Sequence, residues 1–394
     1  MARSRTVIVA GAGIGGLTAA LTLTREGFRV VVLEQAERLE ETGAGIQLSP
    51  NATGILLGLG LGERLKSRAV APEAIRVLAA TRAKEIVRIP LGGAAALRYG
   101  APYWVIHRGD LQAALVEALE ATPDVVLRLG SRVEDFAVHA HGVTVVAKGR
   151  SGAIDEHGIA LIGADGLWSV TRARLGDRSR PRFRRRTAWR ALVPADRVPP
   201  DLREPATFLW LGADAHLVHY PVGGGAMINI VAIVGDTRPA RGWSTAGARA
   251  ELLRRFSRWH PRVRALVEAP EAWLKWSLYD RRPPRKWGHG PVTLIGDAAH
   301  PMLPFLAQGG AMAIEDAAVL ASCLARASDD PAAALRTYEG LRRRRTARAQ
   351  RGARWNGIVY HLKGPAAVAR NLALAAVGGE RLLGHYDWLY DWRQ

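Results

Sequence analysis

The hydrophobic pattern of residues 6–33 predicts a β-α-β unit. Thr6–Ala10 and Phe28–Leu33 are short apolar runs rich in β-branched residues, typical of strands buried on both faces of a parallel sheet. Gly11–Gly16 interrupts the apolar pattern between them. Leu17–Arg25 then has helical composition and ends before Gly27, a residue type that suits a helix C-cap. The unit predicts the opening of a doubly wound α/β sheet.

The remaining pattern divides into two kinds of segment. Residues 110–121 read as a helix with Asp110 as its N-cap, and strands are expected at 125–129, 143–147 and 159–162. After Arg186 the pattern becomes a meander of short strands, a pair of helices, a buried strand and two long helices. These are expected at residues 188–193, 207–211, 216–220, 227–234, 246–256, 261–268, 292–295, 310–326 and 332–351.

This order predicts an α/β protein with three parts. A Rossmann-like nucleotide-binding domain would comprise residues 1–75, 99–177 and 288–346. An inserted β-sheet domain for the substrate would comprise 76–98 and 178–287, and 347–394 would form a C-terminal helical tail.

Composition indicates an ordinary globular enzyme. Of 394 residues, 48% are hydrophobic and 23% are charged, which argues against a disordered chain. The lone Cys323 allows no internal disulfide, and we predict no metal site and a reducing, cytoplasmic location. Residues 6–24 are uncharged, but four glycines interrupt them, so we expect neither an export signal nor a membrane span.

The formal net charge of +19 raises a nucleic-acid hypothesis. Arginine supplies 49 of the 55 basic residues, with runs at Arg182–Arg186 and Arg342–Arg345. A nucleic-acid site would interleave stacking aromatic residues with such runs, and only Phe183 does so. We therefore favour solvated arginine faces and no nucleic-acid partner, with a basic nucleic-acid-binding protein as the competing hypothesis.

The first glycine cluster fits a dinucleotide fingerprint. It reads Gly11-Ala12-Gly13-Ile14-Gly15-Gly16, in which the first glycine permits a tight turn and Gly13 lets backbone approach a pyrophosphate. Glu34, followed by Gln35, ends the next strand, where a carboxylate accepts hydrogen bonds from a ribose diol. The fingerprint is compatible with NAD or FAD.

Two further motifs follow predicted strands. Asp165 lies in residues 163–172, and Asp297 lies in residues 296–301. An aspartate at the carboxyl end of a parallel strand can bind a ribityl or ribose hydroxyl. Gly309 and Gly310 then precede a helix at Ala311, whose amino terminus would stabilise negative charge on a reduced flavin.

With these three motifs in order, residues 5–350 resemble the class A flavoprotein monooxygenases, the single-component aromatic hydroxylases. Residues 41–51, 107–111, 188–191 and 302–316 also fit. The nearest branch resembles salicylate hydroxylase, 6-hydroxynicotinate 3-monooxygenase and 3-hydroxybenzoate 6-hydroxylase. The first domain is accordingly expected to bind FAD.

The resemblance implies a set of cofactor contacts beyond the fingerprint. Glu34 would bind the adenosine ribose, Val133 would pack on the adenine, and Asp297 would bind the ribityl and pyrophosphate region. Arg108 would contact FAD, although a surface arginine beside the predicted cap is the alternative. Asp165 and Arg172 would serve FAD and NAD(P)H, and the isoalloxazine would lie by Ile46, Gln47, Pro304, Gly309, Gly310 and Ala311.

The resemblance also implies the reaction. Bound FAD, reduced by NADH or NADPH, would react with O2, and an electron-rich ring would attack the resulting C4a-hydroperoxide. The partners would be a small aromatic or N-heteroaromatic acid, O2 and NAD(P)H, with no membrane partner, in a monomer or homodimer. A flavin epoxidase, or another FAD- or NAD-linked oxidoreductase acting on a non-phenolic substrate, is the alternative.

A base that deprotonates a phenol would assist this reaction. In the strand 216–220, His216 and Tyr220 share one face and His219 points to the other. The nearest branch carries a His-x-x-x-Tyr pair here, so we predict His216 as the base and Tyr220 as its support. A histidine satisfied within the sheet is the alternative. His300 is expected to be structural.

The sequence departs from two enzymes of the nearest branch. Pro304 replaces a catalytic glutamine of 3-hydroxybenzoate 6-hydroxylase. Phe305 replaces a histidine of 6-hydroxynicotinate 3-monooxygenase, and Gln47 lies near another. The resemblance therefore implies the reaction type and leaves the substrate open.

Overall fold

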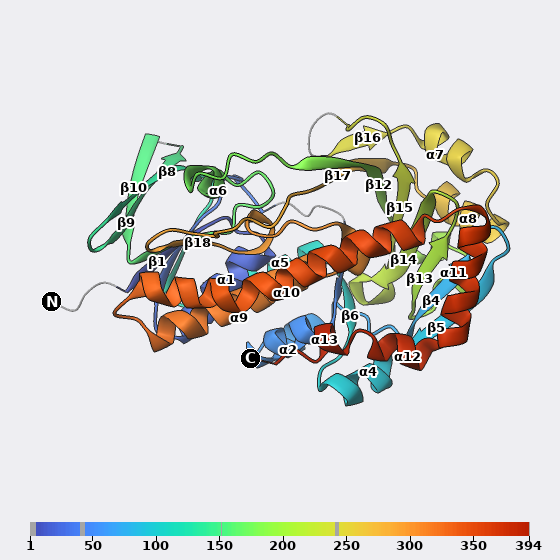
Figure 1. The fold of residues 1–394 in the computed structure, drawn as a ribbon, viewed down its shortest axis with the longest axis horizontal. Coiled ribbons are helices and arrows are strands. Elements are labelled where there is room, and N and C mark those ends of the chain that lie inside the picture. The colour runs from blue at the N-terminus through green and yellow to red at the C-terminus, as the bar shows by residue number, and fades with distance from the viewer. Residues whose placement is uncertain (1–4, 40–43, 151, 241–243, 394) are drawn as a thin grey trace.

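The computed structural model describes residues 5–39, 44–150, 152–240 and 244–393. The first three positions of the motif at 41–51 lie outside these residues. The molecule is elongated, with a parallel sheet at one end and a larger mixed sheet at the other (Figure 1). Helix α10 (Pro331–Tyr360) extends from one end of the molecule to the other.

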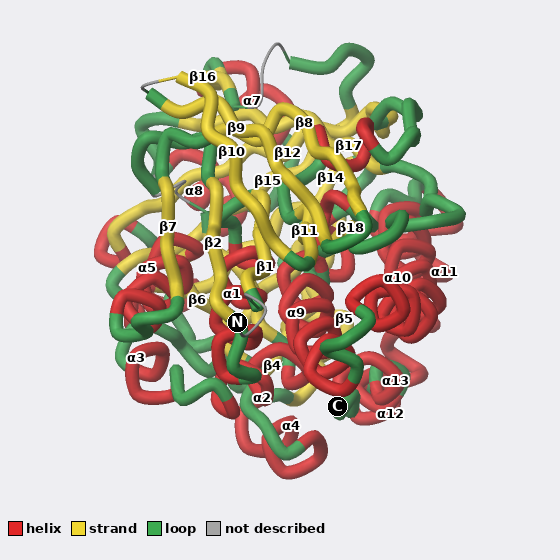
Figure 2. The backbone as a smooth tube through the Cα atoms, turned by 90° about the vertical axis from the view of Figure 1, so that its left-hand side faces the viewer, coloured by secondary structure: helices red, strands yellow, loops and turns green. Residues whose placement is uncertain are grey.

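The parallel sheet has the order β18-β11-β1-β2-β7 (Figure 2). Its strands are β1 (Thr6–Ala10), β2 (Arg29–Leu33), β7 (Val125–Arg128), β11 (Ala160–Gly163) and β18 (Val292–Leu294). Helices α1 (Ile14–Arg25) and α9 (Gly309–Arg326) contribute much of the apolar core against it. The predicted strands are confirmed within one residue. Helix α1 starts three residues earlier than predicted, because the turn at the fingerprint is already helical at Ile14.

A three-stranded antiparallel sheet lies beside the parallel sheet. It has the order β10-β9-β8, with β8 (Arg132–His139), β9 (Gly142–Gly149) and β10 (Gly152–Gly158). Of these strands, only the central part of β9 was expected from the sequence. The apolar residues of β8 and β9 share a core with β1 and β2.

The mixed sheet has the order β16-β17-β12-β15-β14-β13-β4-β5. Its strands are β4 (Ala74–Ala79), β5 (Lys84–Pro90), β12 (Arg182–Pro194), β13 (Thr207–Leu211), β14 (Ala215–Val222), β15 (Met227–Gly235), β16 (Thr245–Gly247) and β17 (Trp273–Asp280). Helices α7 (Arg249–Phe256) and α8 (Pro261–Glu268) pack on one face. The helix predicted from residue 246 is wrong at its start, because 245–247 pair with β17 as a strand.

Shorter elements connect the two ends. Strands β3 (Gly45–Leu48) and β6 (Trp104–His107) pair with each other, near helices α2 (Pro50–Gly58), α3 (Gly62–Lys66), α4 (Gly92–Tyr99) and α5 (Arg108–Glu120). Helix α6 (Val170–Arg174) packs against β8 instead. The prediction of Asp110 as an N-cap is wrong, because α5 begins at Arg108 and His107 occupies the cap position. Asp110 lies in the first turn, where a carboxylate still favours the positive end of the helix dipole.

The C-terminal segment is helical, as predicted. Helix α10 continues nine residues beyond its expected end, and α11 (Gly364–Val377), α12 (Gly379–Gly384) and α13 (Asp387–Tyr390) follow. The last two helices pack against the sheet and tyrosine residues of the central core. Among the described residues, no helix is long and apolar enough to cross a membrane.

Candidate active site

The fingerprint turn is closely packed except at Gly13. A Cβ on Gly16 would lie 1.9 Å from the carbonyl oxygen of Gly11, so this position excludes larger residues. A Cβ on Gly13 would meet nothing within 4 Å, which leaves space over the start of α1. Glu34 accepts hydrogen bonds from the backbone N–H of Ala12 and Ala36, at 2.7 and 2.9 Å. These contacts hold its carboxylate beside the turn.

Other predicted adenosine contacts surround this turn. The Ser131 N–H donates to the Glu34 carbonyl at 2.7 Å, which brings the start of β8 and the buried Val133 to the same strand end. Gln35 is exposed next to Glu34. A Cβ on Gly15 would lie 3.1 Å from Cβ of Ala313, so Gly15 lets α1 approach α9.

Asp297 and Arg108 carry opposite charges in the next part of the site, and they interact electrostatically. The Asp297 side chain is solvent-accessible, while nearly every neighbour around it is buried. The positive charge of Arg108 acts on its carboxylate. Among the described residues, the Arg108 side chain forms no ion pair. An accessible carboxylate and a free guanidinium fit the hydroxyl and phosphate groups of a dinucleotide.

The side chains of Asp165 and Arg172 in the predicted central segment are both held by contacts within the protein. Asp165 Oδ2 accepts from the backbone and hydroxyl of Thr171, whereas Oδ1 is buried without a partner among the described residues. Arg172 is 1% exposed, and its guanidinium donates to Asp177 and to the carbonyls of residues 282, 298 and 299. This arrangement favours a structural part for Arg172 over the predicted contact with NAD(P)H.

Strand β3 brings the predicted isoalloxazine neighbours together. A Cβ on Gly310 would lie 2.7 Å from Cδ1 of Ile46, so the start of α9 lies directly against β3. Gln47 accepts a hydrogen bond from the Tyr103 hydroxyl at 2.6 Å and also lies by Tyr220. Helix α9 begins at Gly309, Ala311 is buried, and Pro304 begins a 3-10 turn just before.

One face of the mixed sheet completes the site. The cross-strand register aligns Ala188 with Ile233 and His216, Arg190 with Val231 and Val218, and Leu192 with Asn229 and Tyr220. Most residues of the sheet centre are buried. Arg190, Val218 and Val231 are only partly buried. This partly exposed part of the sheet face, between the rows of His216 and Tyr220, is referred to below as the hollow.

The predicted alternation of side chains along β14 is confirmed. The His216 ring lies 5.5 Å from that of Phe305, in the loop before α9. His219 points to the other face, where it stacks on Phe208, accepts from Trp210 Nε1 and contacts the Leu202 carbonyl. His219 is therefore a satisfied core histidine.

His216 is electrically neutral at physiological pH. It is 2% exposed, and burial, together with the charges of His361 and Arg186, lowers the pKa of its imidazole well below 6.5. Its Nδ1 lies 2.9 Å from Nε2 of His361. A neutral imidazole can accept a proton, although the lowered pKa makes it a weaker base than an exposed histidine.

Arg190 is a charged group in the hollow, and its role was not anticipated. Its guanidinium forms no ion pair or hydrogen bond with any described residue, and its Nε is buried. It stacks on Trp276 with its central carbon 4.1 Å from the ring centroid. Burial and the charge of Arg108 lower the pKa of Arg190 to about 10, which keeps it charged at neutral pH.

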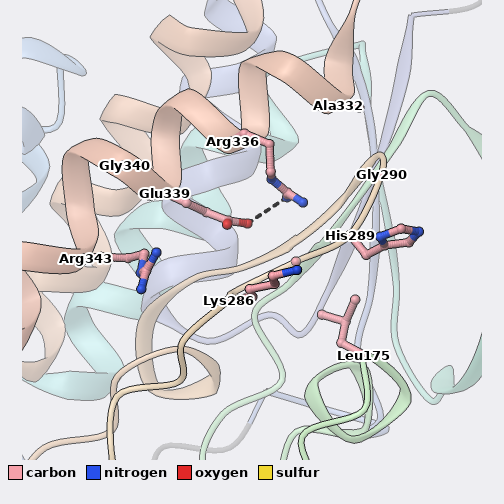
Figure 3. Close-up of a pocket in the computed structure, with 10 residues that line it drawn as sticks. Leu175, Lys286, His289, Gly290, Ala332, Arg336, Glu339, Gly340 and Arg343 are labelled. Atoms are coloured by element: carbon pink, nitrogen blue, oxygen red, sulfur yellow. Dashed lines mark hydrogen bonds and ion pairs between the residues drawn. The ribbon is translucent and has the colours of Figure 1, made fainter.

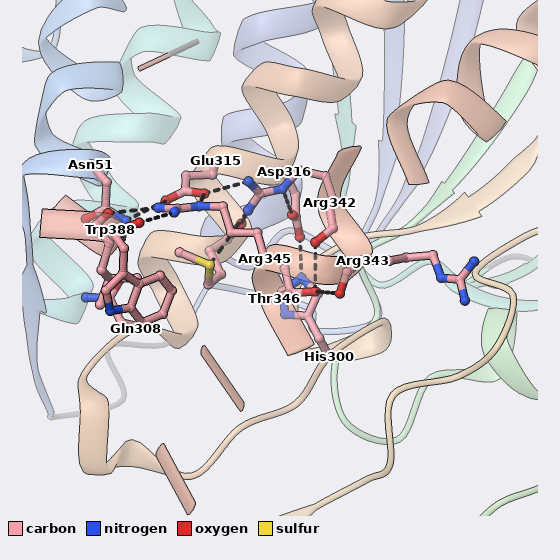
Figure 4. A network of polar contacts seen from close by, with 12 residues as sticks. Asn51, His300, Gln308, Glu315, Asp316, Arg342, Arg343, Arg345, Thr346 and Trp388 are labelled. Carbon is pink, nitrogen blue, oxygen red and sulfur yellow. Dashed lines mark hydrogen bonds and ion pairs between the residues drawn. The ribbon is translucent and has the colours of Figure 1, made fainter. Parts of the chain in front are cut away.

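A buried polar network supports the loop before α9 (Figure 4). Arg342 donates to Glu315 and Asp316, at 2.6 and 2.7 Å, and Asp316 also contacts His300 Nε2 at 2.5 Å. Arg345 binds Glu315 and the carbonyls of Trp388 and Leu389, which ties the C-terminal segment to the network. The burial of His300 and its contact with Asp316 support the structural role predicted for it, and part of the second arginine run is buried.

A cavity of about 590 Å³ lies elsewhere, between α10 and the loop that enters β18 (Figure 3). Lys286, His289, Arg336 and Arg343 give it a basic lining, and Arg336 is paired with Glu339 at 2.6 Å. Asp297 follows the other end of β18. The cavity is therefore separate from the predicted FAD contacts.

The candidate site therefore combines a dinucleotide-binding turn with a sheet face that carries a neutral histidine and an unpaired arginine. The family model described as FAD binding domain matches residues 4–353. The chain belongs to this family. It is an FAD-dependent monooxygenase of the aromatic-hydroxylase type, with NAD(P)H as co-substrate.

Three comparisons indicate the branch of the family. The chain is 41% identical over 397 residues to 3-hydroxybenzoate 6-hydroxylase of Klebsiella oxytoca, covering 100% of this chain and 98% of the relative. It is 37% identical to 6-hydroxynicotinate 3-monooxygenase of Pseudomonas fluorescens, covering 89% and 91%. A salicylate hydroxylase substrate complex superposes with a TM-score of 0.83 at 28% identity, covering 100% and 97%. The fold and family predictions are thereby confirmed.

The side chains present fit FAD. The open space at Gly13, the accessible Asp297 and the free Arg108 are suited to the pyrophosphate and ribityl chain, with Glu34 at the ribose. When bound, FAD supplies the redox and oxygen chemistry, and the protein supplies orientation and proton transfer. Asn229, Tyr103 and His361 also belong to the site but were not predicted from the sequence. Asn229 and Tyr103 are neutral side chains outside any motif, and His361 lies far along the chain.

Proposed function

We propose that this enzyme hydroxylates a small aromatic acid that already carries a ring hydroxyl, in the hydroxybenzoate or hydroxypyridinecarboxylate class. The names of the relatives support this class, since they act on 3-hydroxybenzoate and 6-hydroxynicotinate. Their substrates share a carboxylate and a ring hydroxyl, and each group needs its own partner in the site.

The observation that carries the proposal is the unpaired guanidinium of Arg190. A partly buried cation without a counter-ion is costly, so its presence favours an anionic ligand. The substrate carboxylate is an anion of suitable size. Arg190 binds it in this proposal, while Val218 and Val231 contact the ring between Arg190 and His216.

His216 would take the hydroxyl of the same ring. Arg190 and His216 are two strands and two residues apart on the same face, so their Cα atoms are about 12 Å from each other at ordinary strand spacings. The two side chains leave room for one aromatic ring between them. His216 accepts the hydroxyl proton, the ring becomes more electron-rich, and Tyr220 orients it.

The test compares acids with their neutral amides. FAD-loaded enzyme is supplied with NADH and either 3-hydroxybenzoate or 3-hydroxybenzamide, and likewise with 6-hydroxynicotinate and its amide. Both NADH oxidation and hydroxylated product are measured. We expect product from at least one acid and a large loss with its amide. Equal rates with acid and amide would show that the carboxylate is not recognised, and product only from a non-phenolic alkene would favour the epoxidase alternative.

Arg190→Met tests the anchor itself. Its KM for the acid should rise roughly 10- to 100-fold, as expected for a hydrogen bond to a charged group, while the amide should be little affected. Arg182→Met, on the exposed end of the same strand, is the matched control. If both variants leave KM unchanged, Arg190 does not bind the carboxylate.

We further propose NADH as the preferred co-substrate, with no separate nicotinamide domain. Rates with NADH and NADPH at equal concentration decide this preference. Whether the enzyme is a monomer or homodimer is answered by light scattering of the FAD-loaded protein.

A further inference from the structure

A chain of two histidines leads away from the proposed substrate hollow. His216 Nδ1 is 2.9 Å from His361 Nε2, and His361 Nδ1 is 2.5 Å from the Gly357 carbonyl oxygen. The two rings have centroids 4.8 Å apart, and both residues are buried. His361 ends helix α10, 145 residues away from His216 in the sequence.

The contacts of this chain determine where the hydrogens lie. A carbonyl oxygen only accepts, so His361 Nδ1 carries hydrogen and donates it to Gly357. A neutral imidazole carries one hydrogen, so His361 Nε2 is an acceptor. His216 must then donate from Nδ1, which leaves His216 Nε2 with its lone pair. No described residue forms a hydrogen bond with that nitrogen.

We propose that His361 is a positioning residue that holds His216 in the tautomer able to accept the substrate's hydroxyl proton at Nε2. The inference rests on the proposed function of His216. In the step, the substrate O–H bond breaks, its proton binds Nε2 of His216, and the substrate keeps the electron pair as phenolate. The resulting imidazolium keeps its Nδ1–H···Nε2 hydrogen bond to His361, which stabilises the new charge.

The surroundings of His361 keep it neutral in this role. Burial and the cations Arg186 and Arg370 lower the pKa of His361 to about 4, while Asp214 and the Gly357 carbonyl oppose that shift. Arg186 lies on β12, Arg370 on α11, and Asp214 in the turn before β14. Lys363 pairs with the same Asp214 at 3.4 Å. At neutral pH, His361 therefore remains an acceptor for His216.

The first experiment reads the tautomer without turnover. FAD-loaded enzyme labelled with ¹⁵N-histidine is studied by NMR at pH 7, and His216→Leu identifies the His216 signals by their loss. We expect hydrogen on Nδ1 of His216 and none on Nε2. In His361→Leu, the hydrogen should redistribute to Nε2. Hydrogen on Nε2 in the native enzyme would overturn the inference, whatever substrate the enzyme uses.

The second experiment separates positioning from a structural role. His361→Leu should lower hydroxylation of an ordinary hydroxybenzoate by tenfold or more, within the roughly 10²- to 10⁴-fold range of base assistance. A fluorinated hydroxybenzoate whose hydroxyl is ionised at the assay pH needs no base and should lose less than threefold. His361→Gln, with an amide oxygen as acceptor, should retain most activity on both.

The two proposals fail in different ways. Equal losses on both substrates in His361→Leu, with no rescue by His361→Gln, would make His361 structural and overturn its positioning role. If the native enzyme hydroxylates neither acid, the proposed function fails, and the NMR spectrum still decides the tautomer.

Discussion

Gly45 and Tyr220 join the strand beside the flavin site to the sheet that lines the substrate hollow. A Cβ on Gly45 would lie 2.6 Å from Cε2 of Tyr220 and 2.8 Å from Cγ of Asn229. The Gly45 N–H also donates to Asn229 Oδ1 at 2.8 Å. Glycine is thus required here by close approach, and the two halves of the site are in direct contact.

Gly45→Ala should disturb this contact. The added methyl group must displace the Tyr220 ring or Asn229, and overpacking of this kind costs about 1–3 kcal/mol. We expect a lower thermal midpoint and weaker coupling of NADH oxidation to hydroxylation. Gly58→Ala is the control, because its Cβ would meet nothing within 4 Å. Equal stability of both variants and of the native protein would show that the contact tolerates a methyl group.

Substitutions at Gly13 and Gly16 distinguish a loss of cofactor binding from a loss of folding stability. Gly13→Val adds atoms to open space, so the apoprotein should fold with a thermal midpoint near that of the native chain, yet bind no FAD and remain colourless. Gly16→Ala should instead destabilise the fold, because its Cβ collides with a backbone carbonyl. Flavin absorbance and differential scanning fluorimetry distinguish the two. Full flavin content in Gly13→Val would refute the assigned pyrophosphate position.

Local patterns predicted the nucleotide-binding end well. The glycine turn, Glu34 and the strands of the parallel sheet follow from short-range rules, because a buried parallel strand needs a continuous apolar run. Residues 76–98 were assigned to the sheet domain, but the strands β4 and β5 and their pairing with β13 could not be predicted in this way. These strands join the mixed sheet from more than 100 residues away, and only tertiary packing decides their partner.

The substrate hollow was predicted only in part. Period-2 alternation was sufficient to place His216 and Tyr220 together on β14. The partner of His216 could not be predicted, since no motif marks His361 and the length of α10 determines where it lies. Arg342 gave a misleading signal: it belongs to a surface-like arginine run, yet it is 1% exposed in an ion-pair network.

Arg342→Met tests that network. Its loss would leave the carboxylates of Glu315 and Asp316 with fewer partners in a dry interior, and breaking a buried pair costs about 3–5 kcal/mol. Urea unfolding should report a loss of this size. The neighbouring Arg344→Met, at an exposed position of the same helix, should be within about 0.5 kcal/mol of the native protein. Similar values for both would mean that the network is not stabilising.

The buried histidine His219 predicts a dependence of stability on pH. Burial lowers the pKa of His219 to about 3, whereas in the unfolded chain it is about 6.5. Below pH 6.5 the unfolded chain therefore binds a proton that the folded protein does not. This contribution to stability is complete above pH 6.5 and decreases by up to about 1.4 kcal/mol per pH unit until pH 3.

His219→Gln should reduce that pH dependence. The free energy of unfolding, measured in urea at pH 7, 6 and 5, should fall less steeply than in the native protein, even if the variant is less stable at pH 7. An unchanged slope would show that His219 titrates normally.

His216→Ala should mainly reduce activity, whereas His219→Ala should mainly reduce stability. The first should keep its FAD but lose hydroxylation by roughly 10²- to 10⁴-fold, because the base is removed. Raising the pH should partly restore its rate, since the substrate hydroxyl then ionises without help. His219→Ala should lose stability, because it leaves Trp210 without its acceptor, but should retain most of its turnover when folded. Product formation and thermal midpoints are measured for both.

If His219→Ala suffers the larger catalytic loss, β14 does not present His216 to the substrate. If neither variant changes product formation, the substrate requires no base at this position.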